Sequence, residues 1–265
     1  MWSYIWHTFF FDPVYNSLVF FIDVLPGGDV GLAIVCTVIF LKIVMLPLSI
    51  KVTKMQAVMR ELDPQMKKIK KTITDKQEQA RATMELYKEK NINPLSSVFL
   101  MFIQFPIIIS LYLAVSNGGG FPFPDINTDL LYSFIARPDA PTMMMLGFFD
   151  ITLKSAPLAL LAGATQFLHI RLSMPKMEPK KEGEEPSLKE DFARSMQMQM
   201  RYVMPIIIVV VAYTLSAAIA LYFTVSNIMA IAQEYVVKRH RPEVETTPEL
   251  GEGKKEGKKK KKKKS

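Results

Sequence analysis

The stretch "VIFLKIVMLPLSIK", from Val38 to Lys51, decides how this chain folds, because it places a charge inside an apolar run. The run extends over residues 30–52. A helix needs about 20 apolar residues to cross a bilayer. Lys42 lies near the middle, where a lysine costs roughly 2.5–3.5 kcal/mol on insertion scales. The stretch predicts a membrane-spanning helix whose lysine has a compensating environment.

The composition is that of a membrane protein. Of the 265 residues, 49% are hydrophobic, and the mean hydropathy is +0.16. The formal net charge of +8 is concentrated between and after the apolar runs. Cys36 is the one cysteine of the chain, so no internal disulfide can form, and we expect a buried thiol.

Five apolar segments predict an all-α polytopic membrane protein. The last two share one run, which is too long for one helix and suits two helices joined by a tight turn near residues 215–218. Lysine and arginine crowd residues 53–93, 173–201 and 238–265, whereas 117–155 holds more acidic than basic residues. The positive-inside rule then puts the N-terminus outside and the C-terminus in the cytoplasm, which five spans satisfy. The predicted spans are 30–52, 94–116, 156–172, 202–216 and 217–237.

Residues 1–29 are apolar but lack the basic start and the cleavage site of a signal peptide. Apolar residues recur at helical spacing at Leu18, Phe21, Ile22 and Leu25. We expect an amphipathic helix that lies in the membrane interface on the outer side, with a spanning segment as the alternative.

The segment 53–93 predicts an antiparallel cytoplasmic hairpin of two helices, the first continuing out of the 30–52 span. Thr74 as N-cap, with Gln77 three residues later, marks the start of the second helix. Methionines adapt to varied partners, so the methionines of the seam are either a client-docking surface or part of a structural spacer. The predicted seam consists of Met55, Met59, Leu62, Met66, Ile69 and Ile73, continued by Ala80, Met84 and Tyr87.

Motifs of common enzymes are missing from the sequence. His7, His169 and His240 are far apart, and there is no glycine-rich phosphate loop, HExxH motif or nucleophile elbow. We therefore expect no catalytic residue, metal or cofactor, and a protein that binds and guides other molecules.

Lys42 has no acidic residue at its depth in any predicted span, so it needs water or polar neighbours. A hydrated cavity among the helices would solvate it. Alternatively, its side chain reaches one membrane face, or it is neutral. The amides that would share the cavity are those of Gln104, Gln166 and Asn227.

Four longer strings resemble the YidC family of membrane protein insertases, with its mitochondrial and chloroplast relatives, in the form without a large outer domain. The resemblance covers nearly the whole chain apart from the tail. It implies five core helices around a hydrophilic groove that opens to the cytoplasm and sideways to lipid. The strings are "GLAIVCTVIFLKIVMLPLSIK", "NINPLSSVFLMFIQFPIIISLYLAV", "MQMRYVMPIII" and "LYFTVSNIMAIAQE".

The resemblance also implies roles for single residues. Lys42 corresponds to a positive residue that faces the groove and is usually arginine in the family. Lysine keeps the charge but loses the planar fork of a guanidinium. Tyr222 and Phe223 correspond to an aromatic pair along which substrates slide.

The implied function is insertion of nascent membrane proteins into the bacterial plasma membrane, without nucleotide hydrolysis. Lys42 would attract acidic residues of the client, whose apolar segment then slides into lipid. We expect a monomer that works alone or beside the Sec translocon. The alternative is a small transporter or channel, although no internal repeat is visible. A structural scaffold would leave Lys42 unexplained.

The C-terminal tail is too polar to fold into a core, and we expect a disordered basic arm. It would bind anionic lipid, or the ribosome through the phosphates of ribosomal RNA, without sequence specificity. Its lysine run consists of Lys258, Lys259, Lys260, Lys261, Lys262, Lys263 and Lys264.

Overall fold

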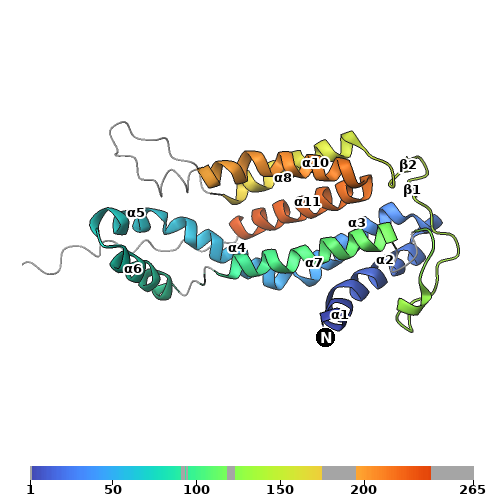
Figure 1. The fold of residues 1–265 in the computed structure, drawn as a ribbon, viewed down its shortest axis with the longest axis horizontal. Helices are drawn as coiled ribbons and strands as arrows, with labels where there is room; N and C mark the ends of the chain where they lie inside the picture. Colours follow the sequence, from blue (N-terminus) through green and yellow to red (C-terminus); the bar gives the residue numbers. More distant parts are fainter. Residues whose placement is uncertain (1, 91–92, 94, 118–122, 175–194, 240–265) are drawn as a thin grey trace, which may run out of the picture.

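In the computed structural model, long helices form a bundle with a helical hairpin at one end (Figure 1). The structure describes residues 2–90, 93, 95–117, 123–174 and 195–239. Nearly all of the elements are helical, as the sequence predicted. In chain order they are α1 (Trp2–Trp6), η1 (His7–Phe11), α2 (Asp12–Val24), η2 (Pro26–Gly28), α3 (Val30–Val44), α4 (Leu46–Glu61), α5 (Asp63–Thr72), α6 (Lys76–Glu89), α7 (Leu95–Asn117), η3 (Thr128–Leu130), β1 (Met144–Met145), β2 (Phe149–Asp150), α8 (Ala156–Ser173), η4 (Gln199–Val203), α10 (Met204–Leu215) and α11 (Ala217–Arg239).

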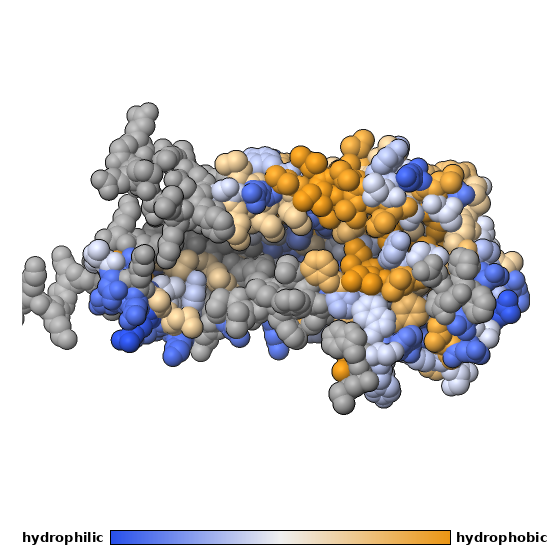
Figure 2. Space-filling model, viewed as in Figure 1, coloured by the Kyte–Doolittle hydropathy of each residue, from blue (hydrophilic) through white to orange (hydrophobic). Residues whose placement is uncertain are grey.

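Within the described residues, two helical stretches are long and apolar enough to cross a membrane, Ser195–Leu215 and Ala217–Val237. The first begins earlier than the predicted 202–216, because good helix formers precede the apolar run. α3 and α4 together would make a third span, bent by 63°. Figure 2 shows apolar side chains gathered over the middle of the bundle and hydrophilic ones toward both ends. The protein is an all-α membrane protein, and the number of five spans stays a prediction.

A break at Met45 corrects the prediction of one uninterrupted helix over residues 30–52. Met45 is the C-cap of α3, and its N–H donates to the Leu41 carbonyl at 3.0 Å. α4 begins at the next residue, with Pro47 in its first turn. Proline lacks an N–H and is tolerated where a helix starts, so a new helix begins here in a new direction.

The last two helices meet at the tight turn that the sequence predicted near residues 215–218. α10 ends at Leu215, Ser216 has an extended backbone, and α11 begins at Ala217. The Ala217 N–H donates to the Leu153 carbonyl at 2.8 Å. The loop between α7 and α8 therefore reaches the turn and fixes it.

α5 and α6 form the predicted helical hairpin (Figure 1). Its centre is the buried pair Leu62 and Leu86. Two methionines of the predicted seam, Met59 and Met66, pack against this pair. The Tyr87 hydroxyl donates to the Met66 sulfur at 3.0 Å. These contacts confirm the seam over the stretch where α4 passes into α5.

Two details of the hairpin differ from the prediction. The N-cap of α6 is Asp75 rather than Thr74, because Asp75 is the last extended residue and its carboxylate reaches the Gln77 N–H at 3.2 Å. Met84 lies outside the seam with 55% of its surface exposed, because α6 turns Leu86 inward instead.

The N-terminal helix α2 packs its apolar side against α3. Leu18 and Ile22 of the predicted stripe are fully buried. Phe21 and Leu25 pack at the edge of the same core. The stripe therefore faces protein, and the place of this helix relative to the bilayer stays a prediction.

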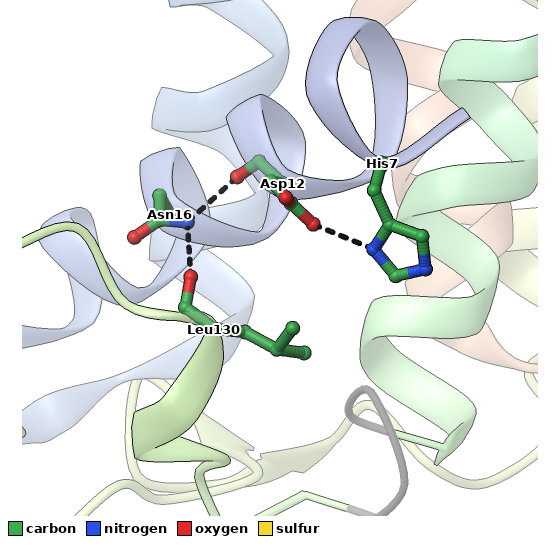
Figure 3. A network of polar contacts seen from close by, with 4 residues as sticks. All are labelled: His7, Asp12, Asn16 and Leu130. Atoms are coloured by element: carbon green, nitrogen blue, oxygen red, sulfur yellow. Dashed lines mark hydrogen bonds and ion pairs between the residues drawn. The ribbon is translucent and has the colours of Figure 1, made fainter. Parts of the chain in front are cut away.

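A polar network on α2 holds the loop between α7 and α8 (Figure 3). The buried Asn16 amide donates to the carbonyls of Asp12 and Leu130, at 2.9 and 2.8 Å. Its oxygen accepts from the Tyr132 N–H at 2.7 Å. Asp12 also contacts the His7 ring, at 2.9 Å. One side chain thus satisfies backbone groups from segments far apart in the sequence.

Asp29 fastens the same loop to the start of α3. One carboxylate oxygen caps α3 by accepting from the Leu32 N–H at 2.9 Å, and the other accepts from the Leu146 N–H at 2.7 Å. Gly28, beside it, has a φ of 61°, and a Cβ here would collide with the Ala140 carbonyl. The loop therefore lies too close to the helix start for a residue with a side chain.

We expect Asn16→Ala to destabilise the fold, because it leaves the Leu130 carbonyl and the Tyr132 N–H without their partner. The expected loss is about 2–3 kcal/mol, measured by thermal unfolding in detergent. Ser17→Ala is the matched control, since the Ser17 hydroxyl donates to the Pro13 carbonyl of its own helix. Equal melting temperatures of the two variants would contradict the proposed role of Asn16.

Candidate functional site

A small pocket opens beside Lys42, where α3, α7 and α11 approach one another. Its wall combines apolar side chains with an ammonium, an amide and a phenol, one from each helix. The break between α3 and α4 also contributes a side chain. The lining residues are Val38, Leu41, Lys42, Met45, Gln104, Ile107 and Tyr222.

The three polar groups of the pocket form one hydrogen-bonded chain. Lys42 Nζ donates to Gln104 Oε1 at 3.3 Å. Gln104 Nε2 in turn donates to the hydroxyl oxygen of Tyr222, which is 2% exposed. An amide suits the central position because it accepts with its oxygen and donates with its nitrogen. This Lys42–Gln104–Tyr222 chain connects three helices.

The hydrogen-bond partner of Lys42 is a neutral amide, which solvates the ammonium without cancelling its charge. A carboxylate in the position of Gln104 would compensate the ammonium more strongly but would leave no net charge in the pocket. The pocket therefore presents a positive charge between helices, where the effective dielectric is lower than in bulk water. Such a site can attract an anionic group.

The structure brings together three of the six residues predicted for the groove: Lys42, Gln104 and Tyr222. Phe223 lies beside Tyr222, with the rings edge to face and their centroids 5.5 Å apart. Phe223 is half-buried and packs against both the main core and the smaller core between α8 and α10. The aromatic pair therefore extends from the pocket toward α8.

The remaining two groove predictions lie outside the pocket lining. Gln166 is half-buried on α8. Asn227 is buried on α11, and its amide donates to the Thr165 hydroxyl at 3.2 Å and to the Ala162 carbonyl at 3.3 Å. In this structure Asn227 holds α8 and α11 together, and its role in a groove stays a prediction.

The predicted docking methionines are not part of the pocket lining. Met55, Met59 and Met66 are half-buried, and Met84 is exposed on α6. The lysine run 258–264 lies outside the described residues. Within the described part of the chain, no group of three or more His, Cys, Asp or Glu side chains could hold a metal ion.

A second amide, which the sequence did not reveal, connects α4 to α11. The Ser49 hydroxyl donates to Gln233 Oε1 at 2.7 Å, and Gln233 Nε2 donates to the Thr53 hydroxyl at 2.8 Å. Ser49 and Thr53 lie four residues apart, a spacing that places them on one helix face. That spacing could have marked a polar helix face in the sequence. It could not have shown the partner, because Gln233 is 184 residues away from Ser49.

A comparison with family models identifies the chain. Residues 21–244 match the model of the 60Kd inner membrane protein family. The chain belongs to the 60Kd inner membrane protein family. The matched range includes the pocket, the hairpin and all helices from α3 to α11, and it agrees with the resemblance found in the sequence.

Relatives similar to this chain are named membrane protein insertases. Membrane protein insertase YidC of Oceanobacillus iheyensis is 30% identical over 89% of this chain and 84% of its own. Membrane protein insertase YidC of Fusobacterium nucleatum is 30% identical over 85% of this chain and 97% of its own. Membrane protein insertase MisCA of Bacillus subtilis is 28% identical, over 92% and 82%. These names confirm the resemblance to YidC insertases and give no support to a transporter or channel.

We expect Gln104→Leu to lower the free energy of unfolding by about 1 kcal/mol, since interhelical hydrogen bonds in membranes are worth roughly 0.6 kcal/mol each. The control is Ser110→Ala on the same helix, because the buried Ser110 hydroxyl has no hydrogen-bond partner in the described structure. Ser110→Ala should leave stability unchanged or raise it. Thermal unfolding in detergent measures the stability of both variants. A Gln104→Leu variant as stable as Ser110→Ala would refute the Lys42–Gln104–Tyr222 hydrogen-bonded chain.

Proposed function

We propose that this protein guides nascent membrane proteins from the cytoplasm into the lipid bilayer, as an insertase and assembly chaperone that needs no nucleotide. The observation that carries the proposal is the charge of Lys42, held between helices by the neutral amide of Gln104. The names of the relatives support the same function.

In this proposal five spans enclose a hydrophilic groove that contains the pocket. They are α3 with the start of α4, followed by α7, α8, α10 and α11. The hairpin and the C-terminus lie in the cytoplasm and the N-terminus outside, as the distribution of basic residues requires. Exposed Lys51 and Lys54 on α4 support this orientation, since they follow directly after the apolar part of the first span.

Insertion begins at the hairpin, where a hydrophobic client segment contacts methionine side chains. Met84 offers an exposed and adaptable surface. Lys42 then attracts acidic residues in the client segment that must cross the membrane. At an effective dielectric constant of about 20, two charges interact roughly four times more strongly than in bulk water. A single lysine can therefore bias the path of a short acidic segment.

The apolar segment of the client then slides along Tyr222 and Phe223 into lipid. Burial of apolar surface, at about 25 cal/mol per Å², drives this step without an external energy source. Tyr222 is buried in the structure, whereas Phe223 is partly exposed. The pocket therefore has to widen before a client can reach Tyr222.

We expect the charge of Lys42 to decide whether acidic clients are inserted. Cells depleted of their own insertase would receive the wild type, Lys42→Arg, Lys42→Ala or Lys42→Glu. Insertion of a single-span client with an acidic outer tail should survive in Lys42→Arg and fall about ten-fold or more in the other two variants, equal to about 1.4 kcal/mol of lost attraction.

A client with a neutral tail is the control for the Lys42 series, and it should insert equally well with all four proteins. Normal insertion of the acidic client by Lys42→Ala would show that the charge does not guide it. Equal failure of both clients would point to a folding defect instead, which the amount of protein in the membrane reports.

The proposed partners of the basic tail are the ribosome and anionic lipids, and the protein acts as a monomer, alone or beside the Sec translocon. Deletion of residues 251–265 should reduce co-sedimentation with ribosomes, and the effect should shrink as salt rises, because phosphate contacts release counterions. Flotation with anionic vesicles tests the lipid partner in parallel. If deletion of residues 251–265 changed binding neither to ribosomes nor to anionic vesicles, the tail would have no part in the proposed function.

A further inference from the structure

The break at Met45 lies between two anchored positions. On the α3 side, Lys42 is hydrogen-bonded to Gln104 of α7 at 3.3 Å. On the α4 side, Ser49 is hydrogen-bonded to Gln233 of α11 at 2.7 Å. Met45 itself lines the pocket beside Lys42. The direction in which α4 leaves the bundle therefore affects the wall of the pocket.

The anchor on the α4 side, which we call the Gln233 clasp, consists of Ser49, Thr53 and Gln233. Both ends of the Gln233 amide are occupied, one by each hydroxyl. Ser49 and Thr53 lie one turn apart along α4, so the amide fixes the rotation of α4 as well as its distance from α11. Thr53 is 8% exposed, whereas Ser49 and Gln233 are half-buried, so the clasp is partly shielded from the surroundings of the protein.

α4 acts as a lever because it continues without interruption from the break to the hairpin. Its 16 residues extend over about 24 Å, so a tilt of about 10° at Met45 would move the far end by about 4 Å. The buried centre of the hairpin begins directly after α4, at Leu62. A force on the hairpin is therefore transmitted to Met45.

We infer that Gln233 is a positioning residue, which sets the direction of α4 and of the hairpin and keeps the pocket beside Lys42 narrow. Release of the clasp lets α4 tilt away from α11, which moves Met45 out of the pocket wall and opens a path to Tyr222. The idea that client docking provides the force rests on the proposed function. The clasp and its effect on the pocket do not depend on it.

The experiment measures the hairpin direction by electron–electron distances in lipid nanodiscs. Spin labels are attached to cysteines at Glu85 of α6 and Ile206 of α10, both exposed, in a Cys36→Ser background. The otherwise unchanged protein should give one narrow distance distribution. Gln233→Leu should add a second, displaced population, and the double variant Ser49→Ala with Thr53→Val should reproduce it.

Thr165→Val is the matched control, because it removes an interhelical hydrogen bond of α11 that does not involve α4. Its distance distribution should equal that of the unchanged protein. If loss of any interhelical hydrogen bond loosened the bundle, the distance distribution of Thr165→Val would shift as well. If the effect is specific to the clasp, only the clasp variants should shift.

Opening of the pocket has its own readout, the reaction of Met45→Cys with a membrane-impermeant maleimide. Gln233→Leu should raise the rate roughly five- to ten-fold, the population change expected from the loss of two interhelical hydrogen bonds. The inference is overturned if folded, monodisperse Gln233→Leu matches the unchanged protein in both distance and rate. If both change while the unchanged protein restores insertion of neither client in the depleted cells, the clasp stands and the proposed function fails.

Discussion

The fold depends on one constraint, the ammonium group of the half-buried Lys42 between the helices of an apolar bundle. Lys42 needs a polar partner among the aliphatic side chains. It is hydrogen-bonded to the amide of Gln104 on α7, which is itself hydrogen-bonded to the phenol of Tyr222 on α11. Three helices must therefore meet at one depth, and the pocket lies at their meeting point. Because the partner is neutral, the charge is stabilised without being cancelled.

Hydrogen bonds from side-chain amides also connect other pairs of helices. Lipid offers no hydrophobic drive for helices to associate, so close packing and interhelical hydrogen bonds have to hold the bundle. Asn227 connects α11 to α8, and Gln233 connects α11 to α4. Gly163 lets α10 approach α8, since a Cβ there would collide with the Val209 side chain. α11 is therefore the common partner that organises the pocket, the lever and the neighbouring helices.

The two ends of the molecule are held together in different ways. At one end, Asn16 ties the loop between α7 and α8 to the N-terminal helices (Figure 3), and Asp29 does the same at the start of α3. At the other end, the hairpin meets the bundle through α4 (Figure 1), which the Gln233 clasp connects to α11. The loop end is thus held by buried hydrogen bonds, whereas the hairpin end is connected through the lever α4. The break at Met45 connects that lever to the charge.

Periodicity and composition were sufficient to predict the helices, the hairpin and the turn before α11, because these depend on local propensity and on where apolar runs end. The charge at Lys42 was equally visible, since its cost follows from its position in an apolar run. Three features could not be predicted from the sequence, because each depends on how α4 and α6 pack. They are the break at Met45, the cap at Asp75 and the outward turn of Met84. Gln104 was a candidate among several amides, and Gln233 was not a candidate at all. The sequence by itself determined that Lys42 needs a polar partner inside a helical membrane bundle. Only the tertiary structure decided which amide it meets and which amide holds α4, because both contacts join residues far apart in the chain.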